Sequence, residues 1–234
     1  NIGMWDHFFS TEFLIWVKAR LGMQLKPLQD KEKAGTLTEQ EVDHMAVVEQ
    51  AYAVDVFDLA DRAEDAKLIV RGERFYQGEM LEGALNTFRE AMAYISAAYY
   101  PASLVFYPME SNLGYRPGVS KEVLACLDDE QVNVYRDLCN QLVMPGVANE
   151  KPDVVGISIG TQMQLLAGLT FGKMIKETFP QIHVVVGGNV ITRLQEDLAK
   201  QEQFFTDVFD SAILYEGEHA LLWLIEALKG ERDI

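Results

Sequence analysis

The sequence contains few cysteines and no apolar run long enough to cross a membrane. Its 234 residues include two cysteines, Cys126 and Cys139, too few for a disulfide framework and not at a metal-binding spacing. Both occupy apolar positions of helical patterns, so we expect buried thiols in the reducing cytoplasm. No apolar stretch reaches the ~18 residues of a membrane span, and no signal-peptide pattern is present. We therefore expect a cytoplasmic chain with no membrane partner.

Positive charge is also scarce. Lysine and arginine total 20 against 36 aspartates and glutamates, which gives a formal net charge of −16. This excess of negative charge argues against nucleic acid or an anionic membrane surface as the main partner. Motifs of catalysis are missing as well: we find no G-x-G-x-x-G, P-loop, G-x-S-x-G, H-E-x-x-H or three-cysteine iron–sulfur pattern. We expect no catalytic or metal-binding constellation within the chain.

The first 150 residues are predicted to form a mainly helical region. A polar stretch, 24–36, reads as a linker, and Leu104–Tyr107 lies between prolines, which suits an edge strand or a loop. Thr38 and Glu41 form the pattern of a capping box at a helix start. The predicted helices are one or two within 4–21, one from the capping box to about Val70, and others over 77–98, 120–127 and 130–144.

Residues 151–234 are predicted to form an α/β half. Three runs rich in valine and isoleucine, Asp153–Ile159, Ile182–Val186 and Ala212–Tyr215, are separated by helical stretches at 161–178 and 193–202, with a last helix over 217–229. Unbroken β-branched runs that alternate with helices indicate parallel strands covered on both faces. Ligands of open parallel sheets bind outside the carboxyl ends of the strands. The loops 158–162, 187–192 and 216–219 are therefore the candidate ligand-binding loops.

Each of these loops carries residues that suit a ligand, but each also has a purely structural explanation. Gly187 and Gly188 allow a ligand to approach the backbone, or they simply turn the chain. The hydroxyls of Ser158 and Thr161 can bond a ligand or cap a helix. Glu216 can accept a hydrogen bond from a ligand, although carboxylates also favour the first turn of a helix. The sequence leaves these alternatives open.

The segments PDVVGISIGTQ, VVVGGNVITRL and DSAILYEGEHALLWLIEAL together resemble the N-terminal cobalamin-binding-type domain of cobalamin-dependent radical SAM enzymes. That pattern consists of a strand ending in Gly-x-Ser, a strand ending in Gly-Gly, and a last strand followed by Gly-Glu-Gly-Glu or a variant, here Tyr215-Glu216-Gly217-Glu218. Residues 1–150 more loosely resemble the helical insertion of one branch, often linked to maturation of ribosomal peptides.

The resemblance implies a Rossmann-like, flavodoxin-like parallel sheet that holds the nucleotide tail of cobalamin in the crevice at its strand ends. By position, the residues lining that crevice would be Ser158, Thr161, Gln162, Gly187, Gly188, Asn189, Glu216 and Gly217. S-adenosylmethionine and a [4Fe-4S] cluster would belong to a downstream radical SAM domain, the implied partner, which would methylate or otherwise transform a peptide or small-molecule substrate.

Two departures from the family pattern stand out. The Asp-x-His-x-x-Gly motif, which supplies a histidine to cobalt in related domains, does not occur. Only three of the five strands are found, so we expect the sheet to be incomplete at the N-terminus. A sheet without its central first strand exposes a ladder edge and invites pairing with another chain, such as a second copy.

Two other hypotheses remain. One is a Rossmann-like interaction module that binds no cofactor and docks a catalytic domain or a peptide substrate. Exposed aromatics at Trp5, Trp16, Phe204 and Phe205 would favour it. The weaker one is a flavodoxin-like or receiver-like signalling domain, which lacks the acidic cluster that phosphoryl acceptance needs.

Overall fold

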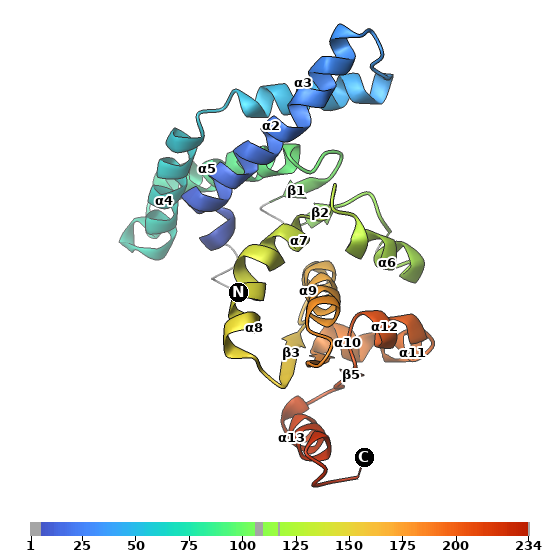
Figure 1. Cartoon of the computed structure of the whole chain (residues 1–234). Helices are drawn as coiled ribbons and strands as arrows, with labels where there is room; N and C mark the ends of the chain where they lie inside the picture. Colours follow the sequence, from blue (N-terminus) through green and yellow to red (C-terminus); the bar gives the residue numbers. More distant parts are fainter. Residues whose placement is uncertain (1–5, 106–109, 117, 234) are drawn as a thin grey trace. The chain divides into compact units, whose positions relative to one another are not determined.

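The computed structural model of the chain describes residues 6–105, 110–116 and 118–233. They form a mixed α/β structure that divides into two compact units (Figure 1). Unit 1 takes the chain up to Tyr115 and includes Glu130–Val134, and unit 2 consists of Arg116–Asp129 and Tyr135–Ile234. The helical region predicted for the first 150 residues thus contributes to both units.

The described residues of unit 1 form four long helices, a short 3-10 helix and an antiparallel pair of short strands. These are α2 (Thr11–Lys33), α3 (Glu39–Tyr52), α4 (Val56–Arg71), η1 (Glu73–Tyr76), α5 (Gly78–Ala97), β1 (Ser103–Val105) and β2 (Glu110–Asn112). The predicted helix over 77–98 is confirmed as α5, and Leu104 lies in a short strand that pairs antiparallel with β2. The prediction for Phe106 and Tyr107 lies outside the described residues.

Two predictions about unit 1 are wrong. The stretch 24–36 is not a linker, because α2 continues through Pro27 to Lys33, with Leu21, Leu25 and Leu28 extending its buried stripe. The capping box of Thr38 and Glu41 is present, but the helix that it opens ends at Tyr52. A new helix begins at Val56, where the Asp55 carboxylate accepts from the backbone N–H groups of Phe57 and Asp58 at 3.0 and 3.3 Å.

Unit 2 holds a three-stranded parallel sheet in the order β3-β4-β5. Its strands are β3 (Val154–Ser158), β4 (His183–Gly187) and β5 (Ser211–Ala212). The strands are confirmed, although β5 is shorter than the predicted run, which extended to Tyr215. Its helical elements are α6 (Ser120–Asp128), α7 (Val134–Leu138), the π-helical η2 (Cys139–Val143), α8 (Met144–Glu150), η3 (Gln162–Gln164), α9 (Leu165–Thr178), α10 (Asn189–Arg193), α11 (Gln195–Leu198), α12 (Glu202–Asp207) and α13 (Gly217–Leu228).

The first face of the sheet packs closely against α9. Gly168 and Gly172 make this possible. A Cβ atom at Gly168 would lie 2.8 Å from the Ile159 side chain, and one at Gly172 would lie 2.7 Å from the backbone oxygen of Val208. The core on this face includes Ile159, Val184, Val186, Leu169, Phe204 and Phe209.

The second face of the sheet is much less covered. Side chains alternate along a strand, so Val154, Gly156 and Ser158 of β3 point to the face opposite Ile157 and Ile159. Gly156 and Ser158 are exposed. The element on this side is α13, and Figure 1 shows it across the strands from α9. None of the side chains of α13 is buried.

Candidate functional site at the carboxyl ends of the strands

The first two candidate loops are joined by backbone hydrogen bonds. The Ile159 N–H donates to the Gly187 oxygen at 2.8 Å, and the Val190 N–H donates to the Ile159 oxygen at 3.1 Å. Ser158 lies opposite Gly187 in the register of β3 and β4. The structure therefore brings Ser158, Gly187 and Gly188 together, as expected for adjacent parallel strands.

The glycine pair has a packing role in this arrangement. Gly188 adopts a φ of 99°, in a region that side chains disfavour, and a Cβ there would lie 2.6 Å from the backbone oxygen of Ile159. A Cβ at Gly187 would lie 3.3 Å from the Ile213 oxygen. Neighbouring backbone fills the space beside both glycines. The absence of a side chain at each position therefore allows the loops to pack closely together.

The first loop presents polar groups at the surface. Ser158, Thr161 and Gln162 are all exposed. The backbone N–H groups of Gly160 and Thr161 donate to the side-chain oxygen of Gln164, at 2.9 and 3.2 Å. Gln164 thus orders the loop, and the Thr161-x-x-Gln164 spacing of a capping box could have revealed this role from the sequence.

The third loop is tied to the second through Thr192 and Tyr215. The Tyr215 N–H donates to Thr192 Oγ1 at 2.8 Å, and that hydroxyl donates to the Gly188 oxygen at 3.2 Å. Tyr215 has a φ of 61°, uncommon for a residue with a side chain, and its hydroxyl lies 3.1 Å from Gln195 Nε2. Tyr215 belongs to the Tyr215-Glu216-Gly217-Glu218 pattern, which does not by itself predict this contact.

Glu216 and Gly217 occupy the start of α13. Glu216 is the N-cap residue, is exposed, and its side chain makes no capping hydrogen bond. A Cβ at Gly217 would lie 3.3 Å from the Ile213 side chain, so this glycine sits against the strand end. Among the described residues, no hydrogen bond joins Glu216 directly to the first loop.

We call the surface formed by residues 158–162, 187–192 and 215–218 the carboxyl rim. Its exposed groups include the hydroxyls of Ser158 and Thr161, the amides of Gln162 and Asn189, the phenol of Tyr215 and the carboxylates of Glu216 and Glu218. Neutral donors and acceptors of this kind, with a carboxylate nearby, suit the hydroxyl and amide groups of a ligand.

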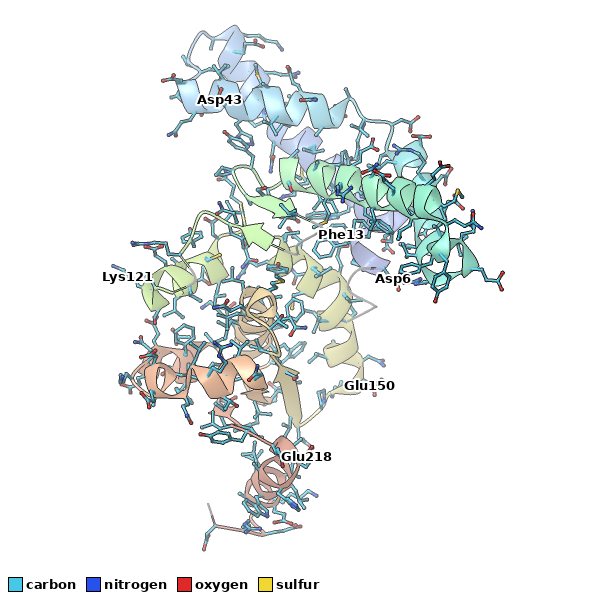
Figure 2. The ribbon with its side chains drawn as sticks, turned by 180° about the vertical axis from the view of Figure 1, so that it is seen from behind. Asp6, Phe13, Asp43, Lys121, Glu150 and Glu218 are labelled. Carbon is cyan, nitrogen blue, oxygen red and sulfur yellow. The ribbon has the colours of Figure 1, made fainter. Side chains whose placement is uncertain are left out.

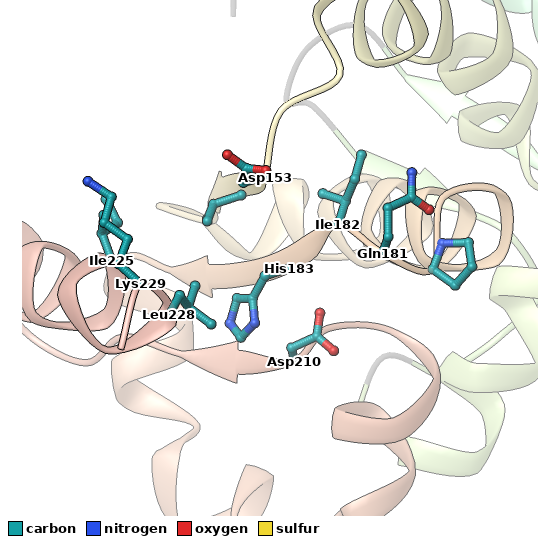
Figure 3. A pocket seen from close by; sticks show the side chains of 10 residues that line it. Asp153, Gln181, Ile182, His183, Asp210, Ile225, Leu228 and Lys229 are labelled. Carbon is teal, nitrogen blue, oxygen red and sulfur yellow. The ribbon is translucent and has the colours of Figure 1, made fainter. Parts of the chain in front are cut away.

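A cavity of about 650 Å³ lies at the opposite, amino ends of the strands. Its walls come from Asp153 and Val154, from Pro180–His183, from Asp210, and from Ile225, Leu228 and Lys229 of α13 (Figure 3). No sequence pattern predicts this cavity, because it arises where α13 does not close on the second face. None of the predicted site residues lines it.

Hydrogen bonds of Asp210, the residue before β5, link it to β4 beside this cavity. Its carboxylate accepts from the Val184 N–H at 2.7 Å and pairs with Lys176 of α9, while its own N–H donates to the Val184 oxygen at 2.7 Å. Burial alone would raise the pKa of Asp210, but the hydrogen bonds from Lys176 and Val184 outweigh it and lower the pKa below its ordinary value. Across the same strands, His183 Nε2 lies 2.8 Å from Ser211 Oγ.

The described residues offer no metal centre, since no group of three or more histidine, cysteine, aspartate or glutamate side chains is placed to hold a metal ion. Both cysteines are buried, as expected, and burial raises the pKa of each thiol to about 12. Within the described part of the chain, no helix combines the length and apolarity that crossing a membrane requires.

Comparisons with family models, with curated proteins and with solved structures each found no match to this chain.

Proposed function

We propose that unit 2 is a cobalamin-binding-type domain of a radical SAM enzyme, with its ligand site at the carboxyl rim. The observation that carries the proposal is the order of the sheet. Three parallel strands are adjacent in chain order, and the loops at their carboxyl ends are linked to one another while their polar side chains face solvent. Ligands of open parallel sheets bind at such ends.

The residues of the rim fit the nucleotide tail of cobalamin better than its metal. The hydroxyls of Ser158 and Thr161 and the amides of Gln162 and Asn189 would bond the tail's hydroxyl and amide groups, and Glu216 would accept from a hydroxyl. The loops 158–162 and 187–192 contain no histidine, and the third loop, 216–219, contains His219, which is exposed in the first turn of α13. Bound cobalamin would supply methyl-transfer chemistry, and S-adenosylmethionine and a [4Fe-4S] cluster would act in a separate downstream domain.

A visible-absorption titration of the chain with hydroxocobalamin tests this proposal. We expect a saturable spectral change with the unmodified chain. The affinity for hydroxocobalamin should fall at least tenfold in Asn189→Trp, because the bulky side chain fills the rim. Asn149→Trp is the matched control, because Asn149 is an exposed asparagine on α8, outside the rim. No saturable change with the unmodified chain, or equal loss in both variants, would contradict the proposal.

A second candidate function is an interaction module that binds no cofactor and docks a catalytic domain or a peptide substrate. The aromatics expected to favour it do not form an exposed patch: Phe204 is buried, Phe205 and Trp16 are half-buried, and Trp5 lies outside the described residues. The observation that favours it instead is α13, which has no buried residue and exposes Leu221, Leu222, Trp223 and Leu228. The apolar face of a surface helix normally packs against a core.

A further inference from the structure

We propose that unit 2 associates with a second copy of itself about a two-fold axis, through the outer edge of β3 and the exposed side chains of α13. This inference does not depend on the proposed function. It rests on a strand edge with no strand neighbour among the described residues and on a helix with no buried residue.

The outer edge of β3 has no strand neighbour among the described residues. Asp153 accepts from the His183 N–H, and the Ile159 N–H donates to Gly187, so the odd-numbered residues of β3 bond to β4. The backbone groups of Val154, Gly156 and Ser158 therefore point away from β4, because these groups alternate along a strand. Such a row of unpaired donors and acceptors is a template for another strand.

This edge is complementary to itself. An antiparallel pairing centred on Gly156 places Gly156 opposite its own copy and Val154 opposite Ser158 of the second copy. All of these residues point their backbone groups outward, so each pair can exchange N–H to oxygen hydrogen bonds as antiparallel ladders require. The two-fold axis would pass beside Gly156, which is exposed.

The same axis would bring the two copies of α13 to one side of the joined sheet. The axis stands perpendicular to the sheet, so an element on the second face of one copy lies on the same face as its equivalent. Ile225 and Leu228 of the helix line the same cavity as Val154 of β3. In Figure 2 the helix that begins at the labelled Glu218 lies apart from the other helices of unit 2, and its side chains project on several sides.

The exposed side chains of α13 would gain burial and charge pairing in this arrangement. Leu222 and Trp223 are 51% and 46% exposed, large fractions for residues of this size in a helix with no buried position. In an antiparallel pair of α13 helices centred between Trp223 and Leu224, Glu218 of one helix would lie opposite Lys229 of the other. Opposite charges at these ends favour a second copy over an unrelated apolar partner.

Size-exclusion chromatography with light scattering on the complete chain, over a range of concentrations, tests the proposal. We expect the measured mass to rise with concentration toward twice the 26.4 kDa of one chain. Leu222→Glu should shift this transition to at least tenfold higher concentration. The matched control is Leu68→Glu, a leucine that is 64% exposed on α4 of unit 1 and should leave the transition unchanged.

A second variant tests the strand edge by itself. Val154→Pro removes an N–H that points outward and is not bonded to β4, at the first residue of the strand, where proline is tolerated. With an unchanged circular dichroism spectrum, this variant should also shift the transition to higher concentration. A single-chain mass at every concentration would overturn the proposal, as would equal behaviour of Leu222→Glu and Leu68→Glu.

Discussion

Gly188 shows how a residue that suits a ligand can be required by the fold. Its positive φ and the approach of the Ile159 backbone both exclude a side chain. The sequence predicted that the Gly187–Gly188 pair lies at a strand end, but it could not tell a ligand surface from a packed turn. That distinction depends on which backbone lies beside the glycine, and the contact comes from β3, some thirty residues earlier in the chain.

Replacement of Gly188 tests this account directly. Gly188→Ala should lower the free energy of unfolding by about 2 kcal/mol or more, because the new Cβ meets the Ile159 backbone and the φ of 99° disfavours it. Gly83→Ala is the control, since Gly83 lies within α5 with no atom within 4 Å of the added Cβ, and it should stabilise by about 0.5 to 1 kcal/mol. Urea unfolding measures both, and similar effects of the two changes would refute the packing role of Gly188.

Asp210 is a residue whose importance the sequence did not indicate. Its carboxylate is held by Lys176 and by the Val184 N–H, which lie on two elements distant in the sequence. Nothing in the run Phe209–Ala212 distinguishes this aspartate from an ordinary polar residue before a strand.

The lowered pKa of Asp210 predicts a dependence of stability on acid. Because the pKa is lower in the folded than in the unfolded chain, its contribution is complete above the ordinary value of 3.8 and is lost as the pH falls through the folded pKa. Asp210→Asn should cost about 1 kcal/mol at neutral pH and should flatten the loss of stability below pH 3.8.

The control for Asp210→Asn is Asp197→Asn. The Asp197 side chain is 82% exposed and lies 3.6 Å from Lys200, so the loss of its charge should change little. Urea unfolding at neutral pH and near pH 3 compares the two variants with the unmodified chain. An equal effect of both substitutions at neutral pH would show that the link between β4 and β5 does not depend on the Asp210 charge.

At the scale of elements, local signals located most helices but placed some of their ends wrongly. Pro27 and the polar residues around it suggested a linker, yet the leucines at 21, 25 and 28 keep one buried stripe and the helix continues. Conversely, Asp55 ends the expected long helix because its carboxylate caps a new one. In the first case tertiary burial outweighs propensity, and in the second a local cap outweighs a continuous apolar pattern.

The cost of the proline in α2 can be measured. Pro27 lies within the helix, is exposed, and cannot donate the hydrogen bond of a helical residue, so Pro27→Ala should raise the free energy of unfolding by about 1 to 3 kcal/mol. Lys26→Ala, at the preceding exposed position, should change it by less than about 0.5 kcal/mol. Thermal unfolding of the two variants provides the comparison. A destabilised Pro27→Ala variant would mean that the proline ring makes packing contacts that the helix needs.

At the scale of the whole molecule, the parallel sheet and the place of its three loops were predictable, while the extent of its cover was not. Valine-rich strands that alternate with helices indicate a sheet covered on both faces. Only the first face meets that expectation, because α9 closes on it through Gly168 and Gly172 while α13 leaves Gly156 and Ser158 exposed. The cavity and the free edge of β3 follow from this unequal cover, which depends on three-dimensional packing and not on any one motif.

Hydrogen–deuterium exchange of the chain with and without hydroxocobalamin is the most direct test of the carboxyl rim as the ligand site. The account predicts slower exchange at 158–164, 187–192 and 215–219 when the ligand is present, with no change at 180–184 or 225–229 beside the cavity. Slower exchange confined to the cavity segments, or no change in any segment, would contradict it.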